Sequence, residues 1–136
     1  MASPRMLALR NGQTWYLSTI PAPPDTPRRW SACVLASVRE VPLSVGEVFA
    51  KAAIDGRCKA ILVIAPNSEA VHDHVDSLVE SQGATDVLTT FHTGTEGLSD
   101  ALSLLDARIG GDGPVYAFSD PPEFLEAGLR EMGLLE

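Results

Sequence analysis

Several polar side chains of this sequence directly follow short apolar segments, a position at which α/β proteins hold their ligands. Arg39 is the only permanent cation among them, so an anionic ligand there would meet it. His92 is the only one that titrates near neutral pH, which suits a general acid or base. In the alternative interpretation Thr93, Ser119 and Asp120 cap helices and Arg39 pairs with an acid. The residues predicted to bind a ligand are Arg39, Glu40, Asn67, Ser68, His92, Thr93, Ser119 and Asp120.

The segment His72-Asp73-His74, followed by Asp76, combines residue types that bind metals. On a helix, however, His72 and His74 lie about 200° apart around the axis and cannot share one ion. His72 and Asp76 are four residues apart and can, but two ligands do not close a site. The spacing therefore predicts a surface helix and no metal. On that helix we expect Asp73, Asp76 and Glu80 to face water and to bind a basic partner.

No sequence pattern for a bound cofactor is present. Residues 37–44, between the first apolar segment and its helix, contain no glycine, so the backbone cannot approach a pyrophosphate as a dinucleotide site requires. A glycine loop with lysine and a hydroxyl residue, which would bind a nucleoside triphosphate, is also missing. Residues 110–113 are rich in glycine but precede a strand, which indicates a helix end and a turn. We therefore expect no cofactor.

Two cysteines are too few for a disulfide scaffold and suit a reducing, cytoplasmic compartment. Cys33 lies inside an apolar segment and is expected to be buried. Cys58 lies between Arg57 and Lys59, whose charges favour the thiolate, but no catalytic partner is predicted beside it. Residues 1–10 lack the apolar stretch of a secretory signal. No apolar segment approaches the ~20 residues that a membrane span requires.

Acidic residues are concentrated in the second half of the chain, whose 136 residues carry a net charge of −8. Residues 1–65 hold eight basic and four acidic residues, a net charge of +4. Residues 66–136 hold two basic and fourteen acidic residues, a net charge of −12. Such a field repels nucleic acid and attracts basic proteins. The alternative is a solvated acidic face without a partner.

The elements that must position these residues are strands and helices in alternation. Four apolar runs are continuous, which is typical of strands buried on both faces, and between and after them apolar residues recur with helical spacing. These runs are Ala32–Val38, Ala60–Ala65, Val87–Phe91 and Val115–Phe118. Capping residues predict helix starts near Ser44, Asn67, Thr93 and Asp120. Glycines predict helix ends at Gly56, Gly83 and Gly110-Gly111.

Four strand–helix units predict right-handed crossovers and a parallel sheet. Because the first two of these strands are the most apolar, the predicted order is 3-2-1-4, with the flavodoxin-like order 2-1-3-4 as the alternative. The predicted fold class is α/β, a small three-layer sandwich with a four-stranded parallel, Rossmann-like or flavodoxin-like sheet. Residues 1–20 are predicted to add a β-hairpin at one edge or end, with Asn11-Gly12 in a type I′ turn. Residues 21–29 are predicted to be a proline-rich connector, and residues 30–136 the α/β core of one overall domain.

Trp30 before the first apolar run, the segment Val71–Leu78 and the strand end Leu88-Thr89-Thr90-Phe91-His92 occur in this order. Their order and spacing resemble a family of small bacterial α/β domains in which the third strand ends in Thr-Thr-aromatic-His and an acidic stretch follows. The resemblance covers about residues 28–105. It implies a bacterial, cytoplasmic α/β domain and no particular chemistry, because the family carries no assigned activity.

Two classes of function fit these observations. The first is a non-catalytic binding or regulatory module, such as an acidic, immunity-like partner of a basic protein. The second is an enzyme or a binder of a small anionic ligand that uses the carboxyl edge of the sheet. The acidic second half, the small size and the lack of a recognisable catalytic set favour the first class.

Overall fold

The computed structural model describes residues 4–21, 30–84 and 86–135. Strands and helices alternate through most of this range, as the sequence predicts. The elements are β1 (Arg5–Ala8), β2 (Thr14–Ser18), β3 (Ala32–Ser37), α1 (Leu43–Asp55), β4 (Ala60–Ile64), α2 (Ser68–Ser81), β5 (Leu88–His92), α3 (Gly94–Asp106), β6 (Val115–Asp120) and α4 (Pro122–Glu131). Each helix begins within two residues of its predicted start. The predicted connector at residues 21–29 lies, except for Pro21, outside the described residues.

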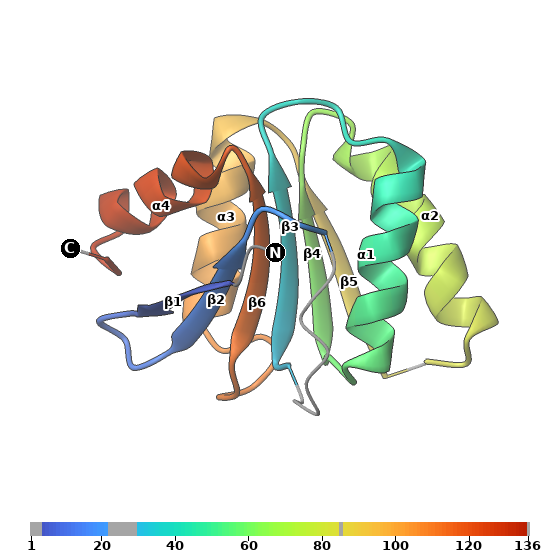
Figure 1. Cartoon of the computed structure of the whole chain (residues 1–136), viewed down its shortest axis with the longest axis horizontal. Helices are drawn as coiled ribbons and strands as arrows, with labels where there is room; N and C mark the ends of the chain where they lie inside the picture. The colour runs from blue at the N-terminus through green and yellow to red at the C-terminus, as the bar shows by residue number, and fades with distance from the viewer. Residues whose placement is uncertain (1–3, 22–29, 85, 136) are drawn as a thin grey trace.

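The sheet has six strands in the order β1-β2-β6-β3-β4-β5 (Figure 1). Its last four strands are all parallel and reproduce the predicted order 3-2-1-4. The prediction of a four-stranded parallel sheet is nevertheless wrong. The hairpin joins the same sheet, because β2 pairs parallel with β6 and β1 pairs antiparallel with β2. The result is a mixed sheet in which β1 alone runs against the others.

Helices cover both faces of the sheet, α1 and α2 on one side and α3 and α4 on the other (Figure 1). Successive residues of a strand point to opposite faces, so each strand contributes to both cores. In β3, Cys33 and Leu35 belong to the core under α1 and α2, whereas Val34 and Ala36 belong to the core under α3 and α4. The three-layer arrangement places the loops after β3, β4, β5 and β6 along one edge of the sheet.

Large aromatic side chains attach the hairpin to the sheet. Trp15 of β2 is completely buried in the core under α3 and α4. On the opposite face, the ring of Trp30 lies between Tyr16 and Tyr116, with ring centroids 5.5 Å apart in both pairs. Burying an aromatic side chain of this size removes roughly 150–250 Å² of surface from water. The burial of this apolar surface favours the position of the hairpin beside β6.

The hairpin turn is not of type I′, because only Gly12 of the predicted pair has a positive φ, +92°. The Leu9 carbonyl accepts the Gly12 N–H, and the Leu9 N–H donates to the Gln13 carbonyl. These bonds enclose a three-residue loop, residues 10–12, that ends in a left-handed glycine. Asn11 uses its side chain instead: its oxygen accepts the Gln13 N–H and its amino group donates to Asp106. These side-chain bonds hold Asn11 out of the left-handed conformation that a type I′ turn needs.

Two further predictions about local structure are wrong. Gly56 follows α1 but has a φ of −78°, while Arg57 takes the left-handed conformation with a φ of 56°. Glycine is needed at position 56 because a Cβ there would lie 2.6 Å from Cδ1 of the buried Trp30. The run Val87–Phe91 is not buried on both faces, since Leu88 is 49 % and Phe91 43 % exposed. β5 is the last strand of the sheet and has a neighbour on one side only.

Candidate functional site

The carboxyl ends of β3 and β6 form a topological switch point, where the chain leaves two neighbouring strands toward opposite faces of the sheet. Ser37 at the end of β3 is in register with Asp120 at the end of β6, and the Val38 N–H donates to the Asp120 carbonyl. The chain leaves β3 toward α1 on one face and leaves β6 toward α4 on the other. Ligands of open α/β sheets bind at such a point.

Arg39 and Asp120 face each other across this switch point. Their nearest atoms, Nη2 and Oδ1, are 3.9 Å apart, and the side chains are 71 % and 45 % exposed. The only cation of the predicted ligand site is therefore partly neutralised by an acid, as the alternative interpretation expects. Glu40 beside it is exposed. An ion pair this open to water is weak, so an anion could displace Asp120 at little cost.

Three other predicted residues hold the loops together. The Asn67 side chain accepts the Val41 N–H and donates to the Val41 carbonyl, both at 2.9 Å, which joins the β3–α1 loop to the start of α2. Ser68 shares a hydrogen bond of 2.8 Å with Thr93. Their polar groups are already bonded within the chain, so they stabilise the loops at this edge.

The interpretation of Thr93 and Asp120 as helix caps is wrong, whereas Ser119 does accept a backbone N–H near the start of α4. Asn67 and Thr93 occupy N-cap positions, but neither side chain bonds to the helix that it precedes. The cap position of α4 is held by Pro121 rather than Asp120. Ser119 is buried, donates to the Pro121 carbonyl at 2.6 Å and accepts the Leu125 N–H. The Ser44 start is also displaced, because α1 begins at Leu43 after Pro42.

His92 lies at the end of β5 and is not part of the same cluster. Three strand spacings of about 4.8 Å separate β5 from β6, which places His92 roughly 14 Å from Asp120. Its Nε2 atom lies 2.9 Å from the Thr90 hydroxyl. Partial burial lowers the pKa of His92, and the charge of Asp100 offsets part of this effect. His92 is therefore mainly neutral at pH 7, and no predicted acid or cation of the switch point lies beside it.

A cavity of about 350 Å³ opens at this edge between the two ends of the predicted site. Of the predicted residues, only Thr93 lines it. The lining is mainly apolar and consists of Ser37, Val38, Ile64, Ala65, Pro66, Thr93 and Phe124. Sequence reasoning missed the cavity because it searched for polar groups. The available signal was Val38, an apolar residue just beyond the end of a buried strand.

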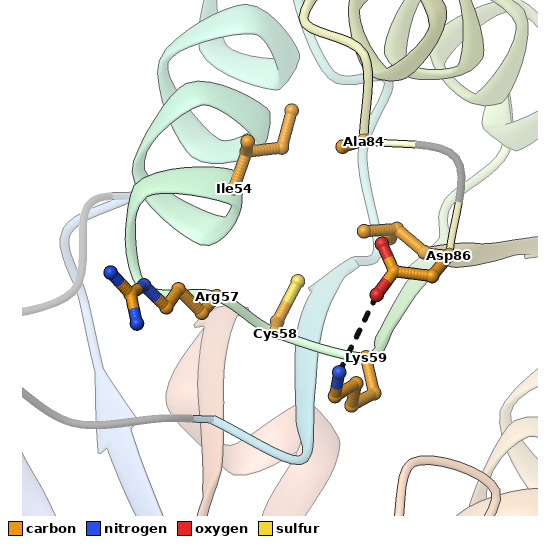
Figure 2. Close-up of a pocket in the computed structure, with 7 residues that line it drawn as sticks. Ile54, Arg57, Cys58, Lys59, Ala84 and Asp86 are labelled. Atoms are coloured by element: carbon orange, nitrogen blue, oxygen red, sulfur yellow. Dashed lines mark ion pairs between the residues drawn. The ribbon is translucent and has the colours of Figure 1, made fainter.

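A second cavity, of about 270 Å³, lies beside the amino ends of β4 and β5, where α1 and α2 end (Figure 2). Figure 2 shows the Cys58 sulfur directed into it, although Cys58 is only 2 % exposed. Lys59 Nζ and Asp86 Oδ2 form an ion pair of 3.5 Å at its rim. Burial, together with the neighbouring Cys58 thiol, raises the pKa of the Cys33 thiol. A neutral thiol is a poor nucleophile, so Cys33 has the character of a core residue.

The acidic residues predicted to bind a partner lie on α2. Asp73 and Glu80 are exposed as predicted. The prediction that Asp76 faces water is wrong, because Asp76 is half-buried against β5 and its carboxylate accepts a hydrogen bond of 3.1 Å from Thr89. Glu69, which was not among the predicted residues, lies on the same face of α2. The positions 69, 73, 76 and 80 recur at the three- and four-residue spacing of one helix face. We call Glu69, Asp73, Asp76 and Glu80 the acidic stripe.

The acidic stripe has little positive charge near it. Within the described ranges, no lysine or arginine forms an ion pair with its four members. Among the described residues, His72 is the histidine that pairs with the stripe; its Nδ1 lies 3.3 Å from Asp73 and its Nε2 lies 3.1 Å from the Thr89 hydroxyl. No group of three or more histidine, cysteine or acidic residues in this part of the chain is arranged to hold a metal.

Comparison of the chain with known protein families, curated proteins and solved structures gives no match. Among the helices of the described residues, none combines the length and the apolar character that crossing a bilayer demands.

Proposed function

We propose that this protein is a cytoplasmic, non-catalytic binding module that binds a basic protein through the acidic stripe of α2, as an immunity-like partner does. The observation that carries the proposal is the stripe itself, four acidic residues on one face of a helix without lysine or arginine. Uncompensated charges at close range repel one another, so the stripe costs folding energy. A basic partner would relieve this repulsion on binding.

The arrangement of the remaining reactive groups favours binding over catalysis. His92 ends β5 and Arg39 follows β3, two strand spacings or roughly 10 Å away, and Arg39 faces Asp120. General acid–base catalysis needs its groups within about 3 Å of the same reacting atom. A docking surface needs only charge and shape, which α2 supplies.

The test uses the protein that co-purifies with this chain from its host in equal amount. Reversing Asp73, Asp76 and Glu80 to lysine is expected to slow association at least about tenfold, because charges at an interface steer the encounter. Association should also weaken steeply with salt, since the Debye length falls to about 8 Å at 0.15 M. Association that is independent of salt, or an unchanged rate in the triple variant, contradicts the proposal.

A matched control comes from acidic residues on other surfaces. Reversing Asp55, Glu123 and Glu131, all exposed, changes the net charge by the same amount without touching α2. If this control slows association as much as the α2 variant, overall charge rather than the acidic stripe drives binding. Urea unfolding of both variants verifies that each remains folded.

The cavity of about 350 Å³ supports a second candidate, a small-ligand binder or enzyme at the carboxyl edge. A ligand with an apolar body and an anionic group would fill the space beside Phe124 and reach Arg39 at the switch point. Mass spectrometry of the purified protein under native conditions tests for a retained small molecule. Loss of that molecule in an Arg39→Ala, His92→Ala double variant favours this candidate. A folded double variant that retains the molecule contradicts this candidate.

A further inference from the structure

The outer edge of β5 leaves backbone hydrogen-bonding groups unpaired. The Leu88 N–H donates to the Lys59 carbonyl, and the His92 carbonyl accepts the Ala65 N–H, so residues 88 and 92 turn their backbone groups toward β4. Alternate residues of a strand turn these groups in opposite directions. The N–H and C=O groups of Thr89 and Phe91 therefore point outward, and no described strand pairs with them.

β5 also lacks the features that protect sheet edges. Natural edge strands carry lysine, proline or a bulge that blocks further pairing. β5 has none of these; its side chains are two threonines, a histidine, Leu88 and Phe91, the last two more than 40 % exposed. The opposite edge differs, because Arg5 of β1 is exposed and pairs with Glu126 of α4. β5 is therefore an edge strand without a lysine, arginine or proline that would block a further strand.

The side chains of β5 that face α2 are already held in place. The Thr89 hydroxyl donates to Asp76 and is bonded to His72. The His72 ring packs on Phe91 with ring centroids 4.9 Å apart. Added strands bind best to edges that are ordered beforehand, because less conformational entropy is lost.

Acidic residues flank this edge on both faces of the sheet. On one face lies the acidic stripe, with Asp76 bonded directly to β5. On the other face α3 carries exposed Glu96 and Asp100, and Asp100 is close enough to His92 for its charge to act on the imidazole. A second copy paired antiparallel through β5 would place two acidic stripes beside each other. Like charges disfavour that pairing, whereas a strand with lysine or arginine side chains would meet opposite charge on both faces.

We propose that β5 accepts an extended segment of a basic partner as a seventh strand, paired to the backbone of Thr89 and Phe91. Lysine or arginine side chains of this strand contact Asp73 and Asp76 on one face and Asp100 on the other. Strand addition of this kind takes its affinity from main-chain hydrogen bonds and its specificity from alternate side chains. The inference rests on the proposed function and adds the manner in which the partner binds.

The test uses a short synthetic peptide with the repeat Lys-Lys-Val-Val and capped ends as the probe, because an extended strand of this sequence presents lysine on both faces. A second peptide of the same sequence is N-methylated at alternate residues, which keeps its charge and removes its pairing edge. At about 10 mM salt, where the Debye length is about 30 Å, the first peptide is expected to bind. N-methylation should weaken binding at least about tenfold, equivalent to about 1.4 kcal/mol. In hydrogen exchange, the Thr89 and Phe91 amides should become protected only with the first peptide.

Two variants of Phe91 separate the backbone from the ring. Phe91→Pro removes the ring and the outward N–H, and proline is tolerated where an edge strand turns its N–H to solvent. Phe91→Ala removes the ring but keeps the N–H. The proline variant should bind the first peptide at least about threefold more weakly than the alanine variant, because it lacks one main-chain hydrogen bond to the peptide. If the proline variant does not fold, the comparison of the two peptides decides the question.

The remaining outcomes overturn the inference in distinguishable ways. If both peptides bind equally and the Thr89 and Phe91 amides stay unprotected, the strand pairing is wrong while a basic partner for the acidic stripe is retained. If neither peptide binds, strand pairing is also wrong, and the proposed function is decided by the charge-reversal experiment. If sedimentation of the protein alone shows a dimer that Phe91→Pro dissociates, a second copy occupies the edge instead.

Discussion

Replacing Asn67 by alanine is the sharpest test of how the carboxyl edge is held together. The Asn67 side chain makes two hydrogen bonds of 2.9 Å with the backbone of Val41, one as acceptor and one as donor. A hydrogen bond contributes about 0.5–1.5 kcal/mol net, so Asn67→Ala is expected to lower the free energy of unfolding by about 1–3 kcal/mol. In a domain of this size, this corresponds to a fall in Tm of roughly 3–5 °C for each kcal/mol.

Urea unfolding followed by circular dichroism measures the loss, with an unchanged m value as the sign that only stability differs. Hydrogen exchange at the Val41 amide should increase in parallel, because that N–H loses its acceptor. Ser77→Ala is the matched control, since it removes a hydrogen bond of 3.1 Å from the Ser77 hydroxyl to the backbone carbonyl of Asp73 on the exposed side of α2. The control should stay within about 0.5 kcal/mol of the original protein. An equally small change for Asn67→Ala would refute the assigned role of this side chain.

Four further predictions concern the core and the titrating groups. Leu62→Ala, at a completely buried position, should cost about 2–5 kcal/mol in urea unfolding, and a loss below about 1 kcal/mol would contradict its central place. Gly56→Ala should cost about 1–3 kcal/mol and alter the fluorescence of Trp30, because the new Cβ lies 2.6 Å from the indole; unchanged fluorescence and stability would contradict this. Because burial lowers the pKa of His92 in the folded state, its NMR titration midpoint should lie below 6.5. The unfolded chain then binds this proton more readily, so His92 should lower the free energy of unfolding as the pH falls through about 6.5. A titration midpoint at or above 6.5 would contradict this. Cys33 should resist iodoacetamide at pH 8 until the protein is unfolded, since burial raises the pKa of its thiol; rapid labelling of the folded protein at Cys33 would be the opposite result.

The strands and helices were predictable because their signals are local. Apolar residues at helical spacing place one face of each helix on the sheet, whatever the rest of the chain does. The strand order also followed from composition, since β3 and β4 are the most apolar strands and lie inside the sheet. The position of the hairpin was left open between an edge and an end, because the contact of Tyr16 with Trp30 joins residues from separate elements.

Turn type and helix caps were predicted less well, because polar side chains have more than one partner within reach. Asn11 bonds Gln13 and Asp106, Asn67 bonds Val41, and Thr93 bonds Ser68. Each of these residues fits a local motif, but a tertiary hydrogen bond replaces the local one. The competing partner lies far away in the sequence in most of these pairs, so no local pattern reveals it.

The sequence by itself determined the α/β class, the four helices, the acidic second half and the exposure of Asp73 and Glu80, because composition and periodicity act within a few residues. Only the tertiary structure decided which strand lies at the edge and what surrounds it. Leu88 and Phe91 belong to a run that resembles a buried strand, and they are exposed because β5 has no neighbour beyond it. The same folding separates His92 from Arg39 and brings Asp76 against Thr89. Proximity between distant segments depends on the sum of all packing contacts, and that sum is not encoded at any single position.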